Sequence, residues 1–265
     1  MKIDEEIVVE GVERAVRPYY DHRGIVIYHG DCREVLPTLT DASIDLVLCD
    51  PPYGHNNNNG DLIYRREAAL GRLPCGENPP LARAIANDGP EANELVRNLF
   101  AEWHRLLKPG CCCCCGGGGG PDPQFARWSL WLDDVFDFKQ MVIWDKGPMG
   151  MGWHYRRSYE TVLVGQKPGA ACHWFDESNK IENIIRNIPR IIPQETDHPT
   201  VKPLALMRHF IALHSEPGDV VLDSCMGEGT TLRAAKDLGR KAIGIEIEER
   251  WCERATQKLR QEVLF

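Results

Sequence analysis

Four consecutive residues, Asp50-Pro51-Pro52-Tyr53, place a carboxylate, two rigid prolyl units and an aromatic ring directly after the mostly apolar run 44–49. The run ends at turn residues, which predicts a buried strand that stops at Asp50, because two prolines cannot donate ladder hydrogen bonds. The carboxyl end of a strand is where ligands bind in open α/β sheets. The stretch also fits a proline turn with Tyr53 packed in the core, and these residues alone leave both interpretations open.

A second group of chemically active residues surrounds a glycine turn. Apolar residues 220–222 lead into Asp223 and the turn Gly227-Glu228-Gly229, and a further strand ends at Glu246, 23 residues after Asp223. Strand, glycine turn, helix and terminal acid are typical of the adenosine-binding half of a Rossmann-type sheet, where the acid holds ribose hydroxyls. A structural turn with solvated acids is the alternative.

The charge of this turn indicates its ligand. Leu232 follows where a dinucleotide fingerprint has its third glycine, and Glu228 would repel a pyrophosphate by roughly 1 to 4 kcal/mol at about 4 Å. S-adenosylmethionine fits better, because it has ribose hydroxyls, a cationic centre and no phosphate. Lys202 could reach the carboxylate of that ligand, although a lysine at a helix entry is more often solvated. His198 is more often a capping or packing residue than a catalyst.

Alternating strand and helix patterns position both groups. Strands are expected at 25–29, 44–49, 140–144, 159–164, 219–222 and 242–247, and helices at 33–39, 91–107, 123–136, 203–214, 230–238 and up to 262. This alternation predicts an α/β fold. Residues 55–90, with an asparagine run and several prolines, are expected to form an insertion over the ligand-binding edge.

Five consecutive cysteines, Cys111–Cys115, precede the glycines 116–120. Successive side chains of a strand point to opposite faces, so five thiols in a strand cannot converge on one ion. Cysteine also packs as a small hydrophobe. We therefore favour a central strand of small residues over a metal site, and expect the glycines to form a flexible loop.

Composition narrows the class of protein. The chain has 265 residues, a net charge of −8, 43% hydrophobic and 26% charged residues, which fits one large or two small α/β domains and argues against a general nucleic-acid coat. The acidic N-terminus has no signal-peptide core, and no run reaches the length of a membrane span. The eleven cysteines are clustered or scattered, which fits a reducing compartment. We expect a cytoplasmic protein with no membrane partner.

The order of the motifs resembles the permuted (β-group) DNA amino-methyltransferases, of the phage or bacterial solitary adenine-N6 type. Asp50-Pro51-Pro52-Tyr53 precedes Asp223–Thr231, and Gly30-Asp31, His198–Pro203 and Gly239–Glu246 complete the pattern. The match covers residues 24–54 and 91–265. The resemblance implies a Rossmann-like S-adenosylmethionine-dependent methyltransferase fold, circularly permuted, with a mostly parallel seven-stranded sheet and helices on both faces, in one domain over 1–265.

The resemblance implies catalytic roles at the first motif. Asp50 and the carbonyl of Pro51, followed by Pro52, would accept the hydrogens of a target amino group, and Tyr53 would stack on a base flipped out of the duplex. An aromatic amino nitrogen is a poor nucleophile because its lone pair is delocalised. Two acceptors would favour its pyramidal form and stabilise the positive charge that develops during methyl transfer.

Cofactor contacts are implied in the same way. Asp31 would hold the adenine end, Glu246 the ribose, and Asp223 with the turn glycines the methionine end. The full implied set is Asp31, Cys32, Lys202, Asp223, Cys225, Gly227, Gly229, Thr230, Glu246 and Ile247. The family usually has Asp-Pro-Phe-x-Gly-Ser-Gly here, whereas this chain has Asp223-Ser224-Cys225-Met226-Gly227-Glu228-Gly229, which predicts a looser and more acidic turn.

Positive charge gathers in the middle of the chain. Residues 139–202 carry nine Lys/Arg and seven Asp/Glu, a net +2 against −8 for the whole chain. This predicts a DNA-facing side there, with a target-recognition segment at 166–197. The candidate DNA contacts are Lys146, Arg156, Arg157, Lys180, Arg186 and Arg190, with Arg65, Arg66 and Arg72 as a second set. Each of them alone is more often a solvated surface residue.

The expected function is transfer of a methyl group from S-adenosylmethionine to the N6 amino group of adenine in double-stranded DNA. By the resemblance, an aspartate at the first motif position favours adenine N6. The alternatives are methylation of cytosine N4 in DNA, methylation of an RNA or protein amide amino group, and a catalytically weak nucleic-acid binder of the same fold. The recognition sequence, a homodimer and a paired restriction endonuclease stay open.

Overall fold

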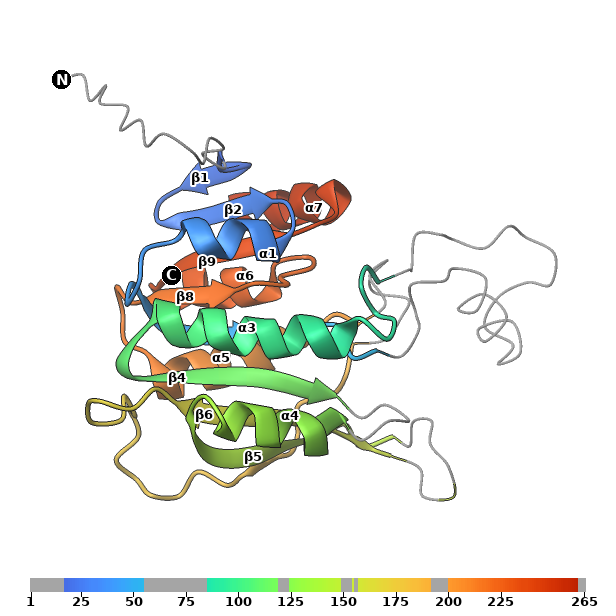
Figure 1. The fold of residues 1–265 in the computed structure, drawn as a ribbon, viewed down its shortest axis with the longest axis vertical. Coiled ribbons are helices and arrows are strands. Elements are labelled where there is room, and N and C mark those ends of the chain that lie inside the picture. The colour runs from blue at the N-terminus through green and yellow to red at the C-terminus, as the bar shows by residue number, and fades with distance from the viewer. Residues whose placement is uncertain are drawn as a thin grey trace.

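The computed structural model describes residues 17–54, 85–118, 124–148, 154, 157–191 and 200–261. Nine strands in these residues form one mixed sheet in the order β1-β2-β9-β8-β3-β4-β6-β5-β7 (Figure 1). The strands are β1 (Tyr20–His22), β2 (Ile25–His29), β3 (Ile44–Cys49), β4 (Leu107–Gly118), β5 (Asp137–Asp145), β6 (Tyr159–Gln166), β7 (Ile184–Ile185), β8 (Val220–Asp223) and β9 (Lys241–Glu246). The helices are α1 (Cys32–Val35), α3 (Ala92–Leu106), α4 (Gln124–Asp133), α5 (Leu204–His214), α6 (Thr230–Asp237) and α7 (Glu249–Arg260), with a 3₁₀ turn at Leu36–Thr38.

The five neighbours β2, β9, β8, β3 and β4 are all parallel, which confirms the expected mostly parallel sheet. Strand β6 is antiparallel to both β4 and β5. The seven expected strands are the longer ones. The structure also has β1 and β7 at the two edges, with three and two residues.

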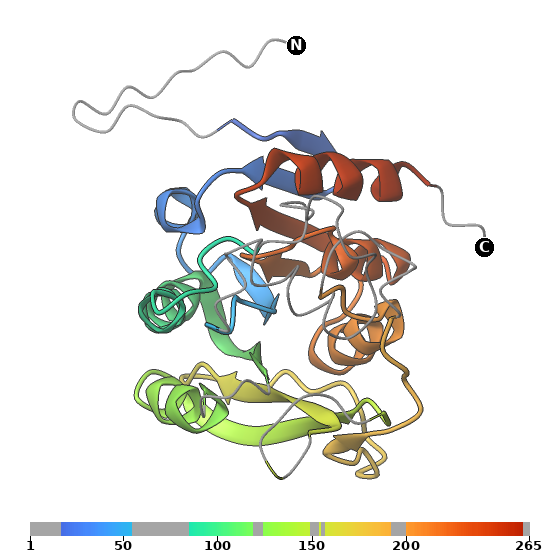
Figure 2. The ribbon, with the colours of Figure 1, turned by 90° about the vertical axis from the view of Figure 1, so that its right-hand side faces the viewer.

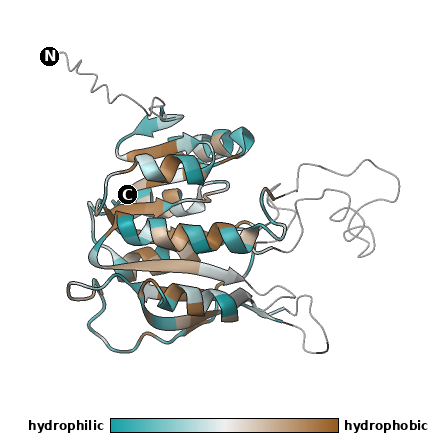
Figure 3. Ribbon diagram, viewed as in Figure 1, coloured by the Kyte–Doolittle hydropathy of each residue, from teal (hydrophilic) through white to brown (hydrophobic). Residues whose placement is uncertain are grey.

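Helices cover both faces of the sheet (Figure 2). Helices α1, α3 and α4 pack on one face in a core that includes Leu99, Trp103 and Trp128. Helices α5, α6 and α7 pack on the other face, around residues such as Phe210 and Leu232. The central strands are largely hydrophobic, whereas the helices are mixed in character (Figure 3), as expected for helices with one buried side. No helix within the described ranges is both long and apolar enough to cross a membrane.

The cysteine run forms the centre of β4, as predicted. Cys112 and Cys114 belong to the core beneath α5 and α6, whereas Cys111, Cys113 and Cys115 belong to the core beneath α3 and α4. The thiols therefore alternate between the two faces, and no group of three metal-ligating side chains occurs in the described part of the chain.

The expected loop at Gly116–Gly120 is wrong for its first three residues. Strand β4 continues to Gly118, because Gly116 and Gly118 pair with Val162 and Thr161 of β6. A Cβ atom at Gly116 would lie 2.8 Å from the hydroxyl of Tyr53 and would overlap the carboxylate of Asp50. Glycine is therefore used here for close approach rather than for flexibility.

Strands β3 and β8 are neighbours, with Leu46 beside Val221 and Val47 beside Leu222. From β3 the chain passes through α3 to β4 on one side, and from β8 it passes through α6 to β9 on the other side. The point between them is a topological switch, where open α/β sheets bind ligands. It places Asp50, just after β3, next to Asp223, the last residue of β8.

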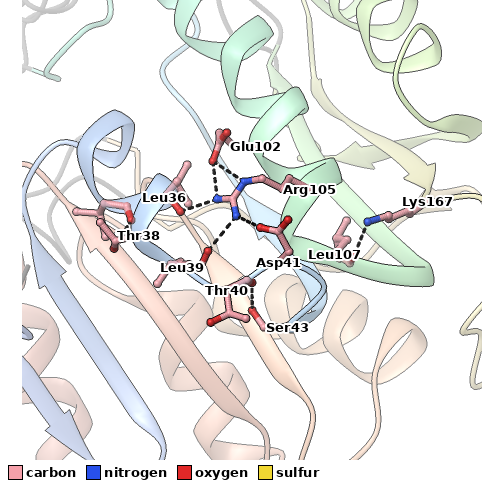
Figure 4. A network of polar contacts seen from close by, with 11 residues as sticks. Leu36, Thr38, Leu39, Thr40, Asp41, Ser43, Glu102, Arg105, Leu107 and Lys167 are labelled. Carbon is pink, nitrogen blue, oxygen red and sulfur yellow. Dashed lines mark hydrogen bonds and ion pairs between the residues drawn. The ribbon is translucent and has the colours of Figure 1, made fainter. Parts of the chain in front are cut away.

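Arg105 fixes the opposite end of α3 (Figure 4). Its guanidinium donates to the carbonyls of Leu36 (2.8 Å) and Leu39 (2.9 Å) and to the carboxylates of Glu102 (2.7 Å) and Asp41. These bonds tie the connection before β3 to the C-terminal turn of α3. Toward the other end of α3, Leu95 lies at the functional edge of the sheet.

Candidate active site

A cleft of about 1110 Å³, open to solvent, lies at the switch point. All four predicted catalytic residues line it, together with nine of the ten predicted cofactor residues. The latter are Asp31, Cys32, Lys202, Asp223, Cys225, Gly227, Thr230, Glu246 and Ile247. Gly229 is the exception. It precedes α6 with φ +75°, and a Cβ atom there would lie 2.8 Å from the Cβ of Ala255, so it serves the turn geometry.

Asp50 is held from two sides. Its Oδ1 accepts a hydrogen bond from the hydroxyl of Tyr53, and its Oδ2 accepts one from the ammonium of Lys202. Burial raises the pKa of Asp50, and the charge of Lys202 opposes that rise. A carboxylate has about four lone-pair positions, so Asp50 keeps acceptor capacity for a substrate amino group.

The ring of Tyr53 packs at a tilt against Trp128, with 6.1 Å between ring centroids. The ammonium of Lys202 lies 5.3 Å from the centroid of the Tyr53 ring. Burial, followed by the charge of Asp50, raises the pKa of Tyr53 well above its ordinary value. The tyrosine is therefore neutral, and its hydroxyl donates a hydrogen bond to Asp50.

Lys202 forms two contacts with carboxylates of this chain. Besides Asp50, its ammonium lies 3.3 Å from Oε2 of Glu160 on β6. Glu160 also accepts a hydrogen bond from Lys146 at 2.8 Å. Lys146, a predicted DNA contact, is half-buried, and its ammonium pairs with Glu160. The sequence placed Glu160 in a strand but gave no indication that it lies at the functional site.

Asp88 is a second residue that the sequence did not identify. Its side chain is 1% exposed, and its Oδ1 accepts the backbone N–H groups of Tyr53 (2.8 Å) and Gly54 (2.9 Å). It thus fixes the turn that carries the catalytic motif. Asp88 lies at the end of the expected insertion 55–90, of which residues 55–84 lie outside the described residues.

Carboxylates bind the backbone of the glycine turn. Oε2 of Glu246 accepts from the N–H of Gly227 (3.0 Å) and Oε1 from that of Glu248 (2.9 Å), while Asp223 accepts from the N–H of Cys225 (3.2 Å). Burial raises the pKa of Asp223 to about 6 and that of Glu246 to about 7. Both acids therefore titrate near neutral pH.

Asp31 is the N-cap of α1. Its carboxylate accepts from the backbone N–H of Arg33 (2.9 Å) and from the guanidinium of the same residue. These bonds, with the Arg33 side chain as the largest cause, lower the pKa of Asp31. Asp31 is thus ionised and fixed at the wall of the cleft.

The turn is braced where a looser one was expected. The hydroxyl of Ser224 accepts a hydrogen bond from the indole of Trp103 on α3 (3.1 Å) and contacts the thiol of Cys49 (3.3 Å). The carboxylate of Glu228 pairs with Lys258 on α7 at 2.5 Å. The extra negative charge of Glu228 is therefore paired. Ser224, which replaces the usual proline, is buried, whereas Cys225, which replaces the aromatic ring, is half-buried at the wall of the cleft.

The side chains of the cleft suit a phosphate-free cationic nucleoside. Among the described lining residues, seven carry carboxylates and only Lys202 carries a positive charge, which is already paired. A pyrophosphate would find no free cation on these walls, whereas ribose hydroxyls and a sulfonium would find acceptors and negative charge. The indole of Trp251, on α7, adds an apolar wall.

The candidate DNA contacts differ in position. Lys180, Arg186 and Arg190 are exposed, Arg157 is half-buried, and Arg156 lies outside the described residues. Strand β7 runs parallel to β5 beside Ile143 and Trp144. Because β5 ends at the same edge as β3 and β4, the chain that carries Arg186 and Arg190 leaves β7 at the edge of the sheet that bears the cleft.

Comparisons with known proteins show similarity to DNA methyltransferases. The family model described as DNA methylase matches residues 44–257. The DNA adenine methyltransferase YhdJ of Escherichia coli (strain K12) is 26% identical over 88% of this chain and 82% of its own. A DNA modification methylase, TTHA0409 from Thermus thermophilus, complexed with S-adenosylmethionine, superposes with a TM-score of 0.62 at 25% identity, over 88% and 91% of the two chains. The M1.HpyAVI–SAM complex gives 0.62 at 26% identity, over 89% and 98%.

Proposed function

The chain belongs to the DNA methylase family, and we infer from that premise and from its cleft that it transfers a methyl group from S-adenosylmethionine to the N6 amino group of adenine in DNA. The observation that carries this proposal is the position of Asp50. Its carboxylate lies at the end of β3, on the wall of an acidic cleft whose other side is formed by β8 and β9.

When bound, S-adenosylmethionine supplies an electrophilic methyl group. Asp223 and Glu246 would hold its sugar and methionine portions, because both carboxylates face the cleft at the ends of β8 and β9. Neutral Tyr53 and the two prolines would give the target base a rigid wall. Asp50 and the carbonyl of Pro51 would accept the two hydrogens of the amino group.

Two acceptors placed before the reaction lower its barrier in two ways. They favour the pyramidal nitrogen that makes the lone pair available, and they stabilise the positive charge that develops on it. Alignment of the nitrogen with the methyl group supplies much of the remaining rate enhancement. No thiol is required, which agrees with the burial of Cys111–Cys115 away from the cleft.

We propose Lys180, Arg186 and Arg190 as DNA contacts, since these exposed cations precede and follow β7. The segment 166–197 remains our candidate for target recognition, and residues 55–90 for an insertion over the active edge of a single domain. The described cysteines are free thiols, which supports a reducing, cytoplasmic location. A phage origin stays a prediction, and a homodimer and a paired restriction endonuclease stay open.

Mass spectrometry of nucleosides tests the function. Double-stranded DNA without methylated bases is incubated with the full chain and S-adenosylmethionine, and is then hydrolysed. We expect N6-methyladenine. N4-methylcytosine would instead support the cytosine enzyme, and bound DNA without any methylated product would support a binding protein.

A further inference from the structure

Glu160 is a largely buried acid at the border of the active site. It lies on β6, opposite Trp144 of β5, and its side chain is 20% exposed. It lines a small cavity that also contacts Asp50, Tyr53 and Lys202, but it does not line the large cleft that we assign to the cofactor. Its position is therefore on the side of Asp50 that faces away from the cofactor.

Four charges alternate along this side. Lys146 binds Oε1 of Glu160 at 2.8 Å, Oε2 of Glu160 lies 3.3 Å from Lys202, and Lys202 binds Asp50. The cluster has no net charge, which allows it to be buried. Burial disfavours ionisation of Glu160, but Lys202 and Lys146 outweigh it and hold its pKa at about 2.

Oε2 of Glu160 is a buried oxygen that accepts no hydrogen bond from any described residue. The ammonium of Lys202 lies within ion-pair distance of that oxygen, although its donated hydrogen bond goes to Asp50. An ammonium has three donors that rotate freely. Lys202 can therefore give a hydrogen bond to Glu160 without losing its place between the two carboxylates.

We propose that Glu160 is a positioning residue for methyl transfer, which draws the ammonium of Lys202 toward itself and so leaves the carboxylate of Asp50 available to the target amino group. This inference rests on the proposed function. Without Glu160, Lys202 has Asp50 as its single carboxylate partner. A hydrogen bond to an ionised partner is short and strong, so Asp50 then becomes a weaker acceptor for the substrate.

The groups that face Asp50 determine the expected pH dependence. Lys202 lowers its pKa, whereas the charge of Glu160 raises it. Tyr53 donates to Asp50, and Asp223 on β8 and the thiol of Cys115 on β4 lie nearby. Removal of the Glu160 charge should therefore lower the pKa of Asp50 and shift the acid limb of the rate profile to lower pH.

The test is Glu160→Gln, measured as kcat and kcat/KM for DNA against pH with saturating S-adenosylmethionine, so that titration of the cofactor acids does not enter. We expect kcat to fall roughly ten- to hundredfold, the acid limb to move to lower pH, and the KM for S-adenosylmethionine to stay unchanged. Glu160→Asp keeps the negative charge but places it farther from Lys202, because its side chain is shorter. It should lower kcat and shift the acid limb in the same directions, by smaller amounts.

The matched control is Glu102→Gln, which removes a partly buried carboxylate from Arg105 at the opposite end of α3. It should alter stability without moving the acid limb. An unmoved limb in Glu160→Gln, with or without a loss of rate, would overturn the proposal. If that variant does not fold, an unmoved limb in Glu160→Asp would do the same. Absence of N6-methyladenine with the wild-type enzyme would instead reject the proposed function.

Discussion

The carboxylate of Asp88 accepts the backbone N–H of Tyr53 at 2.8 Å, although 35 residues separate them in the chain. Asp88 is buried, and the same oxygen also accepts the N–H of Gly54. Pro51 and Pro52 have no N–H group to donate, so the first N–H groups after them are those of Tyr53 and Gly54. Asp88 accepts both and thereby fixes the end of the motif. The orientation of Tyr53, and through it that of Asp50, depends on Asp88.

We therefore expect Asp88→Ala to reduce both stability and methyl transfer. The buried N–H of Tyr53 and the partly buried N–H of Gly54 lose their acceptor, which should lower the free energy of unfolding by about 1 to 3 kcal/mol. The kcat should fall because Tyr53 is no longer fixed. Asp88→Asn keeps one carbonyl oxygen and should retain most of the activity. Denaturant unfolding and nucleoside analysis measure both effects, and equal activity in all three proteins would exclude this role.

Gly116 gives a second prediction. Its Cα faces the pair formed by Asp50 and Tyr53, and the methyl group of Gly116→Ala would overlap both side chains. We expect kcat to drop more than about tenfold while the affinity for S-adenosylmethionine, measured by calorimetry, stays near that of the wild type.

The control for this substitution is Gly165→Ala on β6. Its Cβ would lie 2.9 Å from the Cβ of Phe136, in the core and away from the cleft. Overpacking there should cost about 1 to 3 kcal/mol of stability without changing kcat for the folded enzyme. If Gly116→Ala also lowered stability without changing kcat, the close approach of Gly116 to Asp50 would not be required for catalysis.

The sequence predicted most of this site because its motifs are local. Asp50 and Asp223 each end a hydrophobic strand, and the switch-point rule places such ends together. Asp88 and Glu160 could not be found in the same way. Asp88 follows a segment without periodicity, and Glu160 depends on a strand pairing that brings Lys202 to it from more than 40 residues away. Similarly, the bracing of Glu228 by Lys258 depends on how α7 packs.

Cofactor binding should depend on pH. The pKa values of Asp223 and Glu246, about 6 and about 7, lie above their ordinary values because the groups are buried. The folded protein thus binds more protons than the unfolded chain between about pH 4 and pH 7, so these two groups make the free protein less stable as pH rises. In the binding mode that we propose, the ionised forms of Asp223 and Glu246 hold S-adenosylmethionine, so its affinity should rise over the upper part of this range.

Calorimetry at about pH 6 and pH 8 measures the affinity for S-adenosylmethionine, which should be higher at pH 8. Thermal unfolding of the free protein should show lower stability at the higher pH. Glu246→Gln should bind the cofactor weakly and with a smaller dependence on pH. An affinity for S-adenosylmethionine that is the same at both pH values would show that these acids do not hold it.

In the mechanism that we propose, the carboxylate of Asp50 accepts a hydrogen bond from the target amino group during methylation of adenine N6. The most direct measurement compares N6-methyladenine formed by the wild type, Asp50→Ala and Asp134→Ala, the last of which removes an exposed carboxylate after α4. We predict product from the wild type and Asp134→Ala, and at least about a hundredfold less from Asp50→Ala, with an unchanged circular dichroism spectrum. Wild-type rates from a folded Asp50→Ala variant would contradict the account.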